Sequence, residues 1–188
     1  TIAKALNCLP SEIYFTSGGT EADNLAMRAA VKDLGCQHII TTAIEHSAII
    51  KTAEQLRDQG KVQLHLLSLQ ENGSVNLEQL EELLHLHKNA YVTLMHGNNE
   101  IANLLPLHDV AEICTKHAAI FHSDTVQTMG HYLFDLQKTP IGMLNAAAHK
   151  FHGPKGIGFL YINKNLKIPS LLIGGGQERG LRAGTENV

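Results

Sequence analysis

The chain has 188 residues, of which 44% are hydrophobic and 18% are charged, a balance typical of folded globular proteins. Fifteen lysines and arginines stand against eighteen aspartates and glutamates, so the formal charge is −3. A chain without a basic excess lacks the electrostatic signature of proteins that bind nucleic acid or an anionic membrane surface. We therefore expect a small-molecule substrate.

Cysteine and histidine usage argue against two further classes. The three cysteines, Cys8, Cys36 and Cys114, have no CxxC spacing, which disfavours a disulfide framework and a zinc knuckle. The twelve histidines are scattered and form no HExxH pattern, so no metal site is predicted.

No apolar run reaches the ~20 residues of a membrane span, and the N-terminus lacks a signal-peptide pattern. We expect a cytoplasmic protein without a membrane anchor.

Short aliphatic runs alternate with amphipathic stretches along the whole chain. Runs rich in β-branched residues predict strands, and apolar residues repeated every three or four positions predict helices. The predicted strands are 12–16, 37–43, 62–69, 90–96, 119–125, 143–149 and 156–162, and the predicted helices are 20–34, 47–60, 77–87 and 107–117. Pro106 is expected in the first turn of the last helix. This alternation predicts one α/β domain over residues 1–188, a three-layer sandwich with a mainly parallel sheet.

Unusual polar clusters follow the predicted strands. Parallel α/β sheets bind ligands at the carboxyl ends of their strands, where loops and helix N-termini converge. The clusters, in chain order, are TSGGTE, IEH, HGNNE, SDTVQ and AHKFHGPKG. We therefore expect one crevice that gathers residues from all five.

The first cluster, residues 17–21, has two interpretations. Its glycines let the backbone approach a ligand, and the following helix N-terminus offers free N–H groups to an anion such as phosphate. A plain glycine turn with Thr20 as the helix N-cap is the alternative. The segment matches neither GxGxxG nor a P-loop.

The lysine in the last cluster also has two interpretations. Lys150 follows a run of small apolar residues, where poor solvation would favour the neutral amine that reacts with an aldehyde. A solvated loop lysine beside a Gly-Pro turn is the alternative. Asp124 and Gln127 follow the neighbouring predicted strand, and an acid there suits a protonated pyridine nitrogen, although a turn aspartate is the simpler interpretation.

Six motifs stand in order along the chain: TSGGTEADN, IEH, HGNNEI, DTVQ, AHKFHGPKGIGFLY and GGGQERGLRAGTENV. In order and spacing, from about Glu12 to the last residue, they resemble the NifS/IscS-like cysteine desulfurases of the class-V aminotransferase superfamily. The resemblance implies a large domain of the PLP-dependent transferase fold (fold type I), with pyridoxal 5′-phosphate (PLP) as cofactor.

The resemblance also implies individual roles. Lys150 matches the lysine that is joined to the cofactor aldehyde, and His46 matches the histidine that stacks on the ring and moves protons. Asp124 matches the partner of the pyridine nitrogen. The other implied contacts are Gly19, Thr20 and His149 at the phosphate, Gln127 at the phenolic oxygen, Asn99 near that oxygen and the substrate carboxylate, and Thr185 at the phosphate of the neighbouring subunit. This last role implies a homodimer.

The chain departs from the family pattern at two points. Ala147 stands where family members usually carry a phosphate-binding serine, so a hydrogen bond worth ~1.5–3 kcal/mol would be missing. The nucleophilic cysteine and the substrate-binding arginine of the family belong to a smaller C-terminal domain and are not found here. The three cysteines are interpreted as packing or incidental residues. We expect a large-domain fragment without the family's N-terminal segment and small domain.

The implied activity is removal of sulfur from L-cysteine, which gives L-alanine and an enzyme persulfide for a sulfur-acceptor or iron–sulfur scaffold protein. The fragment itself is expected to be inactive. One alternative is a selenocysteine lyase or another class-V aminotransferase. A second alternative, from a different class, is a non-catalytic dimerising scaffold module, which Ala147 favours and the intact Lys150, Asp124, His46 and Gln127 disfavour.

Overall fold

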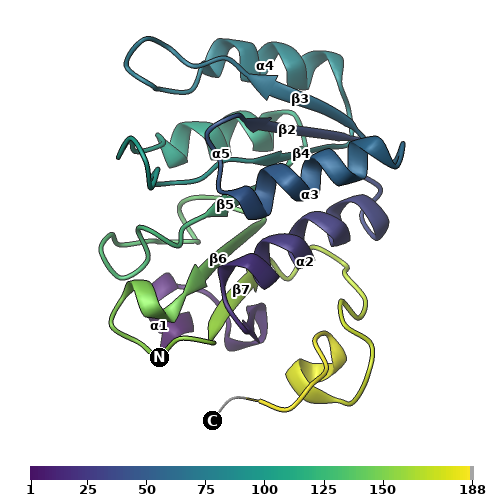
Figure 1. Cartoon of the computed structure of the whole chain (residues 1–188), viewed down its shortest axis with the longest axis vertical. Coiled ribbons are helices and arrows are strands. Elements are labelled where there is room, and N and C mark those ends of the chain that lie inside the picture. The colour runs from purple at the N-terminus through teal and green to yellow at the C-terminus, as the bar shows by residue number, and fades with distance from the viewer. Residues whose placement is uncertain (187–188) are drawn as a thin grey trace.

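A single seven-stranded sheet runs through the molecule in the computed structural model (Figure 1), which describes residues 1–186. The strand order is β1-β7-β6-β5-β4-β2-β3. The strands are β1 (Ile13–Thr16), β2 (His38–Thr42), β3 (Gln63–Leu67), β4 (Ala90–Thr93), β5 (Ile120–Asp124), β6 (Met143–Ala147) and β7 (Gly158–Ile162). Strand β7 is antiparallel to both of its neighbours, and the other pairs are parallel. The sheet is therefore mainly parallel, as predicted.

Helices cover both faces of the sheet. They are α1 (Ile2–Leu6), α2 (Gly19–Lys32), α3 (Ser47–Asp58), α4 (Leu77–Leu86) and α5 (Leu107–Lys116), with short 3₁₀ turns η1 (Pro10–Glu12), η2 (Ala148–Lys150) and η3 (Gln177–Gly180). Helices α2 and α3 lie on one face (Figure 1), and α1, α4 and α5 pack on the other. The three-layer α/β fold is confirmed. In residues 1–186, no helix is long and apolar enough to cross a membrane.

Helix α2 lies close to the sheet because its inner face is built from small residues. Ala22, Ala26 and Ala30 recur every fourth position, so they share one face of the helix, and all three are buried. They pack against apolar residues of the central strands, including Met143 and Leu160. This close packing places the first turn of α2 beside the ends of β6 and β7.

The predicted elements all occur, with most ends shortened by one or more residues. Strand β6 begins at Met143 and ends at Ala147, and every residue in it is buried, as expected for a central strand with helices on both faces. Helix α5 begins at Leu107, as predicted, and Pro106 precedes it as the N-cap residue.

The segment after β7 returns to the outer edge of β1. The backbone N–H of Phe15 donates to Glu178 Oε2 at 3.0 Å, and Arg179 Nη2 donates to the carbonyl of Ile13 at 2.6 Å. The Arg179 guanidinium also lies 4.3 Å from the centre of the Tyr14 ring, in a cation–π contact. Side chains from η3 thus bind backbone groups of an edge strand.

Candidate active site

The carboxyl ends of five strands lie along one edge of the sheet. Strand β1 is antiparallel to β7 and β7 is antiparallel to β6, so β1 runs in the same direction as β6, β5, β4 and β2. The predicted site residues follow these strands: Thr20 after β1, Lys150 after β6, Asp124 at the end of β5, Asn99 after β4 and His46 after β2. The fold thus brings residues separated by 130 positions in the sequence to a common edge.

The start of α2 offers backbone N–H groups beside the central strands. Gly18 is the N-cap residue, so the alternative interpretation of Thr20 as N-cap is wrong, and Thr20 lies exposed in the first turn. The first helical bond joins Ala22 N to Gly18 O, which leaves the earlier N–H groups directed out of the helix. A Cβ at Gly19 would lie 2.8 Å from Val126 Cγ2, so only glycine fits this approach.

Asp124 is a buried carboxylate at the centre of this edge. Its Oδ1 accepts hydrogen bonds from the Val126 N–H at 2.9 Å and from Asn145 Nδ2 at 3.4 Å. Among the described residues, no group donates a hydrogen bond to Oδ2. Burial raises the pKa of Asp124, and the Val126 N–H and the nearby His46 oppose that rise. A cationic partner at Oδ2 would stabilise the charged form further.

His46 lies exposed at the N-cap of α3. Its Nδ1 accepts a hydrogen bond from the Ala48 N–H at 3.1 Å, so in the neutral ring the proton is carried by Nε2. The capping bond fixes the orientation of the imidazole, while the Nε2–H remains available for a ligand. Asp124 lies close enough for the two groups to interact electrostatically.

Glu45 and Asn98 connect the loops that carry His46 and Asn99. Glu45 Oε1 accepts hydrogen bonds from Thr42 Oγ1 at 3.1 Å and from the Met95 N–H at 3.0 Å. Asn98 Nδ2 donates to the carbonyl of Ile44 at 2.8 Å. The loop after β4 is thereby held against the loop after β2. In the IEH and HGNNE motifs, the buried Glu45 and Asn98 hold the backbone in place, and His46 and Asn99 are exposed.

Asn99 and Gln127 occupy the two loops beside Asp124. The exposed side chain of Asn99 donates to Glu100 Oε1 at 2.7 Å. Gln127 is half-buried, and its Cβ would lie 3.8 Å from a Cβ added to Gly97. A Cβ on Gly97 would lie 2.5 Å from Thr128 Cγ2, so a glycine there lets the HGNNE loop approach the turn that carries Gln127 and Thr128.

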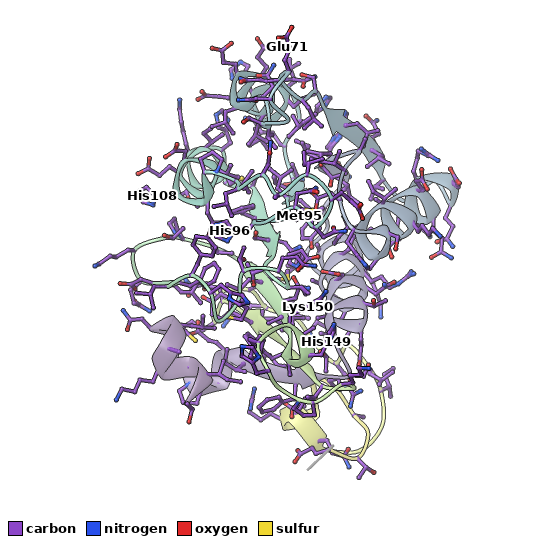
Figure 2. All side chains as sticks on the ribbon, turned by 60° about the vertical axis from the view of Figure 1, so that its left-hand side comes forward. Glu71, Met95, His96, His108, His149 and Lys150 are labelled. Carbon is purple, nitrogen blue, oxygen red and sulfur yellow. The ribbon has the colours of Figure 1, made fainter. Side chains whose placement is uncertain are left out.

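His149 and Lys150 lie in η2, directly after β6 (Figure 2). Both side chains are exposed, so the expectation of a poorly solvated Lys150 is wrong for this chain. The reason is local: β6 ends at Ala147 and η2 carries the next three residues out of the core. Met95 and His96, in the loop after β4, are labelled in the same view.

Thr185 lines a cavity of about 350 Å³ beside the ends of β1 and β7. Ser17, Gly156 and Arg182 contribute to the same wall. The C-terminal motif therefore lies next to the start of α2 in its own chain.

The three cysteines are poor candidates for a nucleophile. Cys36 and Cys114 are buried, and burial raises the pKa of each thiol to about 12. Cys8 is half-buried, and burial together with the charge of Glu12 raises its pKa to about 11. Thiolates, rather than thiols, attack sulfur, so none of the three is suited to accept it. The packing interpretation is supported for Cys36 and Cys114.

Sequence reasoning missed the polar groups under the site. Asp23, in α2, lies with Oδ1 3.8 Å from Nε2 of the fully buried His122, in β5. Burial lowers the pKa of His122 to about 3, and burial and the charges of Asp124 and Glu45 raise the pKa of Asp23 well above its ordinary value. His122 is thus neutral near pH 7. The only sequence signal for Asp23 is an acid on the alanine face of a predicted helix.

These residues fit PLP. The start of α2 suits a phosphate, the buried acid with a free oxygen suits a protonated pyridine nitrogen, and an exposed lysine amine suits an aldehyde. Gly19 supplies the close approach, because any larger residue would contact Val126. The donor set therefore matches the groups that this cofactor presents.

Solved structures share this fold. One titled NifS-like protein superposes with a TM-score of 0.92 at 40% identity, covering 99% of this chain and 52% of that one. A structure titled SspA in complex with cysteine gives a TM-score of 0.92 at 35% identity, covering 98% and 54%. The fold is that of the NifS-like enzymes of fold type I.

The family follows from the sequence comparison. The profile described as aminotransferase class-V matches residues 1–188, and the chain belongs to that family. A cysteine desulfurase IscS from Clostridium botulinum is 44% identical over 189 residues, which are 99% of this chain and 47% of the relative. The resemblance to NifS/IscS-like cysteine desulfurases is confirmed. The chain spans about half the length of the curated relatives it matches.

Proposed function

We propose that this chain is the PLP-binding large domain of a cysteine desulfurase that removes sulfur from L-cysteine. The observation that carries the proposal is the meeting of Asp124, His46 and the start of α2 at the edge where Lys150 follows β6. Relatives named cysteine desulfurase favour this activity over a selenocysteine lyase. The structure of SspA with cysteine supports L-cysteine as the substrate.

In this proposal each cofactor-binding residue contacts a particular group of PLP. Gly19, Thr20 and His149 hold the phosphate, and Asp124 Oδ2 accepts a hydrogen bond from the ring nitrogen. Gln127 and Asn99 bind the phenolic oxygen, and Lys150 binds the aldehyde carbon. When bound, the cofactor supplies the electron sink that lets a carbon–sulfur bond of the substrate break.

Two side chains move protons. The Lys150 amine would move the proton of the substrate α-carbon, because it would hold the cofactor at its aldehyde and its exposed side chain has room to turn. His46 donates from Nε2, since the capping bond from Ala48 occupies Nδ1 and favours the proton on Nε2. Asp124 stays charged and keeps the ring nitrogen protonated.

The thiolate that accepts the sulfur belongs to a cysteine other than Cys8, Cys36 and Cys114. A cysteine thiolate attacks the substrate sulfur, the Cβ–S bond breaks, and L-alanine and a persulfide remain. In an enzyme that also contains the accepting cysteine, replacing Cys8, Cys36 or Cys114 by serine is expected to leave sulfur release unchanged, because burial raises the pKa of their thiols.

We further infer a homodimer in the cytoplasm that delivers sulfur to an acceptor or iron–sulfur scaffold protein. Support for the dimer comes from Thr185, which matches the threonine that the family lends to the phosphate of the neighbouring subunit. Size-exclusion chromatography with light scattering tests this part, and a monomer that binds PLP fully would contradict it.

Borohydride trapping tests the assignment of Lys150. PLP is added to the purified protein, covalently bound cofactor is fixed with borohydride, and the labelled peptide is identified by mass spectrometry. Label is expected on Lys150 and is lost in Lys150→Ala, whereas Lys155→Ala, in the same exposed loop, keeps it. Label on Lys155 or on no lysine would overturn the assignment.

Asp124→Asn tests the ring-nitrogen partner. Asparagine keeps an oxygen for the Val126 N–H but removes the charge, so PLP affinity is expected to fall about tenfold or more. Asp58→Asn, at an exposed helix end, is the matched control. Equal PLP affinity in Asp124→Asn and wild type would contradict the role.

A further inference from the structure

Three histidines that lie far apart in the sequence meet on one face of the sheet. They are His38, the first residue of β2, His65, in β3, and His87, the C-cap residue of α4. One ligand nitrogen from each lies within 4.8 Å of the others. His38 Nδ1 and His65 Nε2 are 3.1 Å apart, and the His87 ring stacks on both, with centroids at 4.5 and 4.4 Å.

The register of the parallel pair produces this meeting. His38 pairs with Gln63, and His65 pairs with Ile40, so both histidines point to the face that α4 covers. Helix α4 then ends at His87, beside β3 at the end of the molecule (Figure 1). The cluster includes the first residue of β2, whereas the candidate active site follows the carboxyl end of the same strand. The two sites are therefore distinct.

The nitrogen separation matches a tetrahedral metal site. With metal–nitrogen bonds of about 2.05 Å, two nitrogens of a tetrahedral zinc site lie roughly 3.3 Å apart. His38 Nδ1 and His65 Nε2 already lie within about 0.2 Å of this separation. Since no pair in the cluster exceeds 4.8 Å, side-chain rotation must close a gap of at most roughly 1.5 Å.

The surroundings suit a cation. All three side chains are half-buried, so an ion can enter from solvent while the rings remain ordered. The C-terminal end of α4 carries the negative end of the helix dipole, which favours a positive charge beside His87.

We propose that His38, His65 and His87 form a binding site for a divalent transition-metal ion, with Zn²⁺ as the best match. Imidazole nitrogens are preferred ligands of such ions, and three of them leave a fourth position for water. The proton now shared by His38 Nδ1 and His65 Nε2 moves to the other nitrogen of its own ring, so no net proton is released. The bound ion joins α4 to β2 and β3.

Metal titration of the purified protein tests the site. The protein is stripped with a chelator and titrated with Zn²⁺ in competition with a chromophoric chelator, and Co²⁺ is used as a spectroscopic probe. We expect one ion per chain at this site and a Co²⁺ spectrum without a thiolate charge-transfer band. Replacing His65 or His87 by alanine is expected to weaken binding more than about 100-fold.

His85→Ala is the matched control, because His85 is exposed on the same helix and lies outside the cluster. It should bind Zn²⁺ as wild type does. His87→Gln changes a residue outside the sheet, so it tests the site if His65→Ala fails to fold by circular dichroism. Unchanged affinity in folded His87→Gln, or a Co²⁺ thiolate band, would show that the ion binds elsewhere and overturn the proposal. Absence of Zn²⁺ binding by wild type would do the same.

Discussion

Arg182 binds the carboxylate of Glu21 through two hydrogen bonds, from Nε to Oε1 at 2.8 Å and from Nη2 to Oε2 at 3.0 Å. Glu21 Oε2 also accepts the Ser17 N–H at 2.6 Å. One carboxylate therefore joins the loop after β1, the first turn of α2 and the segment that carries Thr185. This junction lies at the start of α2, where the phosphate is proposed to bind.

We predict that Arg182→Ala lowers the free energy of unfolding by about 0.5–1 kcal/mol near pH 7, the range for a well-oriented pair that is still partly in solvent. Burial raises the pKa of Glu21, but the hydrogen bonds from Arg182 and Ser17 outweigh it and lower the pKa below 4.5. The stabilisation is therefore present above that pH and is lost as the pH falls through the folded-state value.

Urea unfolding of wild type and Arg182→Ala, at about pH 7 and about pH 3.5, checks this prediction. The difference between the two proteins should shrink at the lower pH. Arg57→Ala removes an exposed pair with Asp58 and should change little at either pH. A difference that persists unchanged at low pH would show that Arg182 stabilises by packing rather than by its charge.

Ala147→Ser is expected to raise PLP affinity about ten- to hundredfold, because it restores one hydrogen bond to a charged group. Ala147 is buried at the end of β6, and its Cβ faces Gly19 at the start of α2, where the phosphate is proposed to bind. Fluorescence titration with PLP measures the change. Ala148→Ser places a hydroxyl one residue further and should have no such effect; a gain in both variants would refute the stated cause.

Gly19→Ala should weaken PLP binding and lower stability. The new Cβ would lie 2.8 Å from Val126 Cγ2, and overpacking of this kind costs about 1–3 kcal/mol. The higher helix propensity of alanine offsets at most ~1 kcal/mol of this cost. The matched control is Gly176→Ala, where φ is −84° and no atom lies within 4 Å of the added Cβ.

A compensating change makes the Gly19 prediction specific. Val126→Ala removes the contacting methyl groups, so the Gly19→Ala/Val126→Ala pair should recover the stability lost in Gly19→Ala. PLP titration and urea unfolding of the four proteins form a double-mutant cycle. If the pair is as unstable as the sum of both single changes, the contact is not the cause.

Glu45→Gln should stabilise the cofactor-free protein at alkaline pH. Burial raises the pKa of Glu45 from 4.5 to about 8. Between these values the folded protein holds a proton that the unfolded chain has released, so wild type loses stability as the pH rises through this range. Glutamine keeps an oxygen for the Thr42 and Met95 donors, and it cannot ionise.

Thermal unfolding measured from about pH 5 to about pH 9 should therefore show two curves that diverge. The gain in unfolding free energy of Glu45→Gln over wild type should be small at pH 5 and on the order of 4 kcal/mol above pH 8. Glu54→Gln, on the exposed face of α3, is the control and should follow wild type. A constant difference at every pH would argue against ionisation of Glu45 as the cause.

The strand-end location of Asp124 and Lys150 was predictable because the alternating pattern determines where each strand stops, and parallel strands share their carboxyl edge. The solvation of Lys150 was not predictable. It depends on the direction in which η2 leaves the sheet, and a run of small residues followed by His-Lys carries no signal for that direction.

The sequence did not predict the polar groups whose positions depend on tertiary packing. Asp23 occurs in an alanine-rich helix, where an acid is usually solvated, and its burial follows from the close approach of α2 to β5. The contact between His38 and His65 requires the exact register of β2 and β3, and His87 joins them only because α4 ends there. Spacing rules for metal ligands describe local motifs and cannot find such a set.

The hydrogen bonds from Glu178 and Arg179 to β1 have a consequence for solubility. An edge strand presents free N–H and C=O groups, and these are a template on which a strand of another molecule can add. Here the Phe15 N–H and the Ile13 carbonyl already form hydrogen bonds with charged side chains. An incoming strand could pair with these groups only by breaking both hydrogen bonds. The GGGQERG motif thus protects the β1 edge of the sheet against edge-to-edge aggregation.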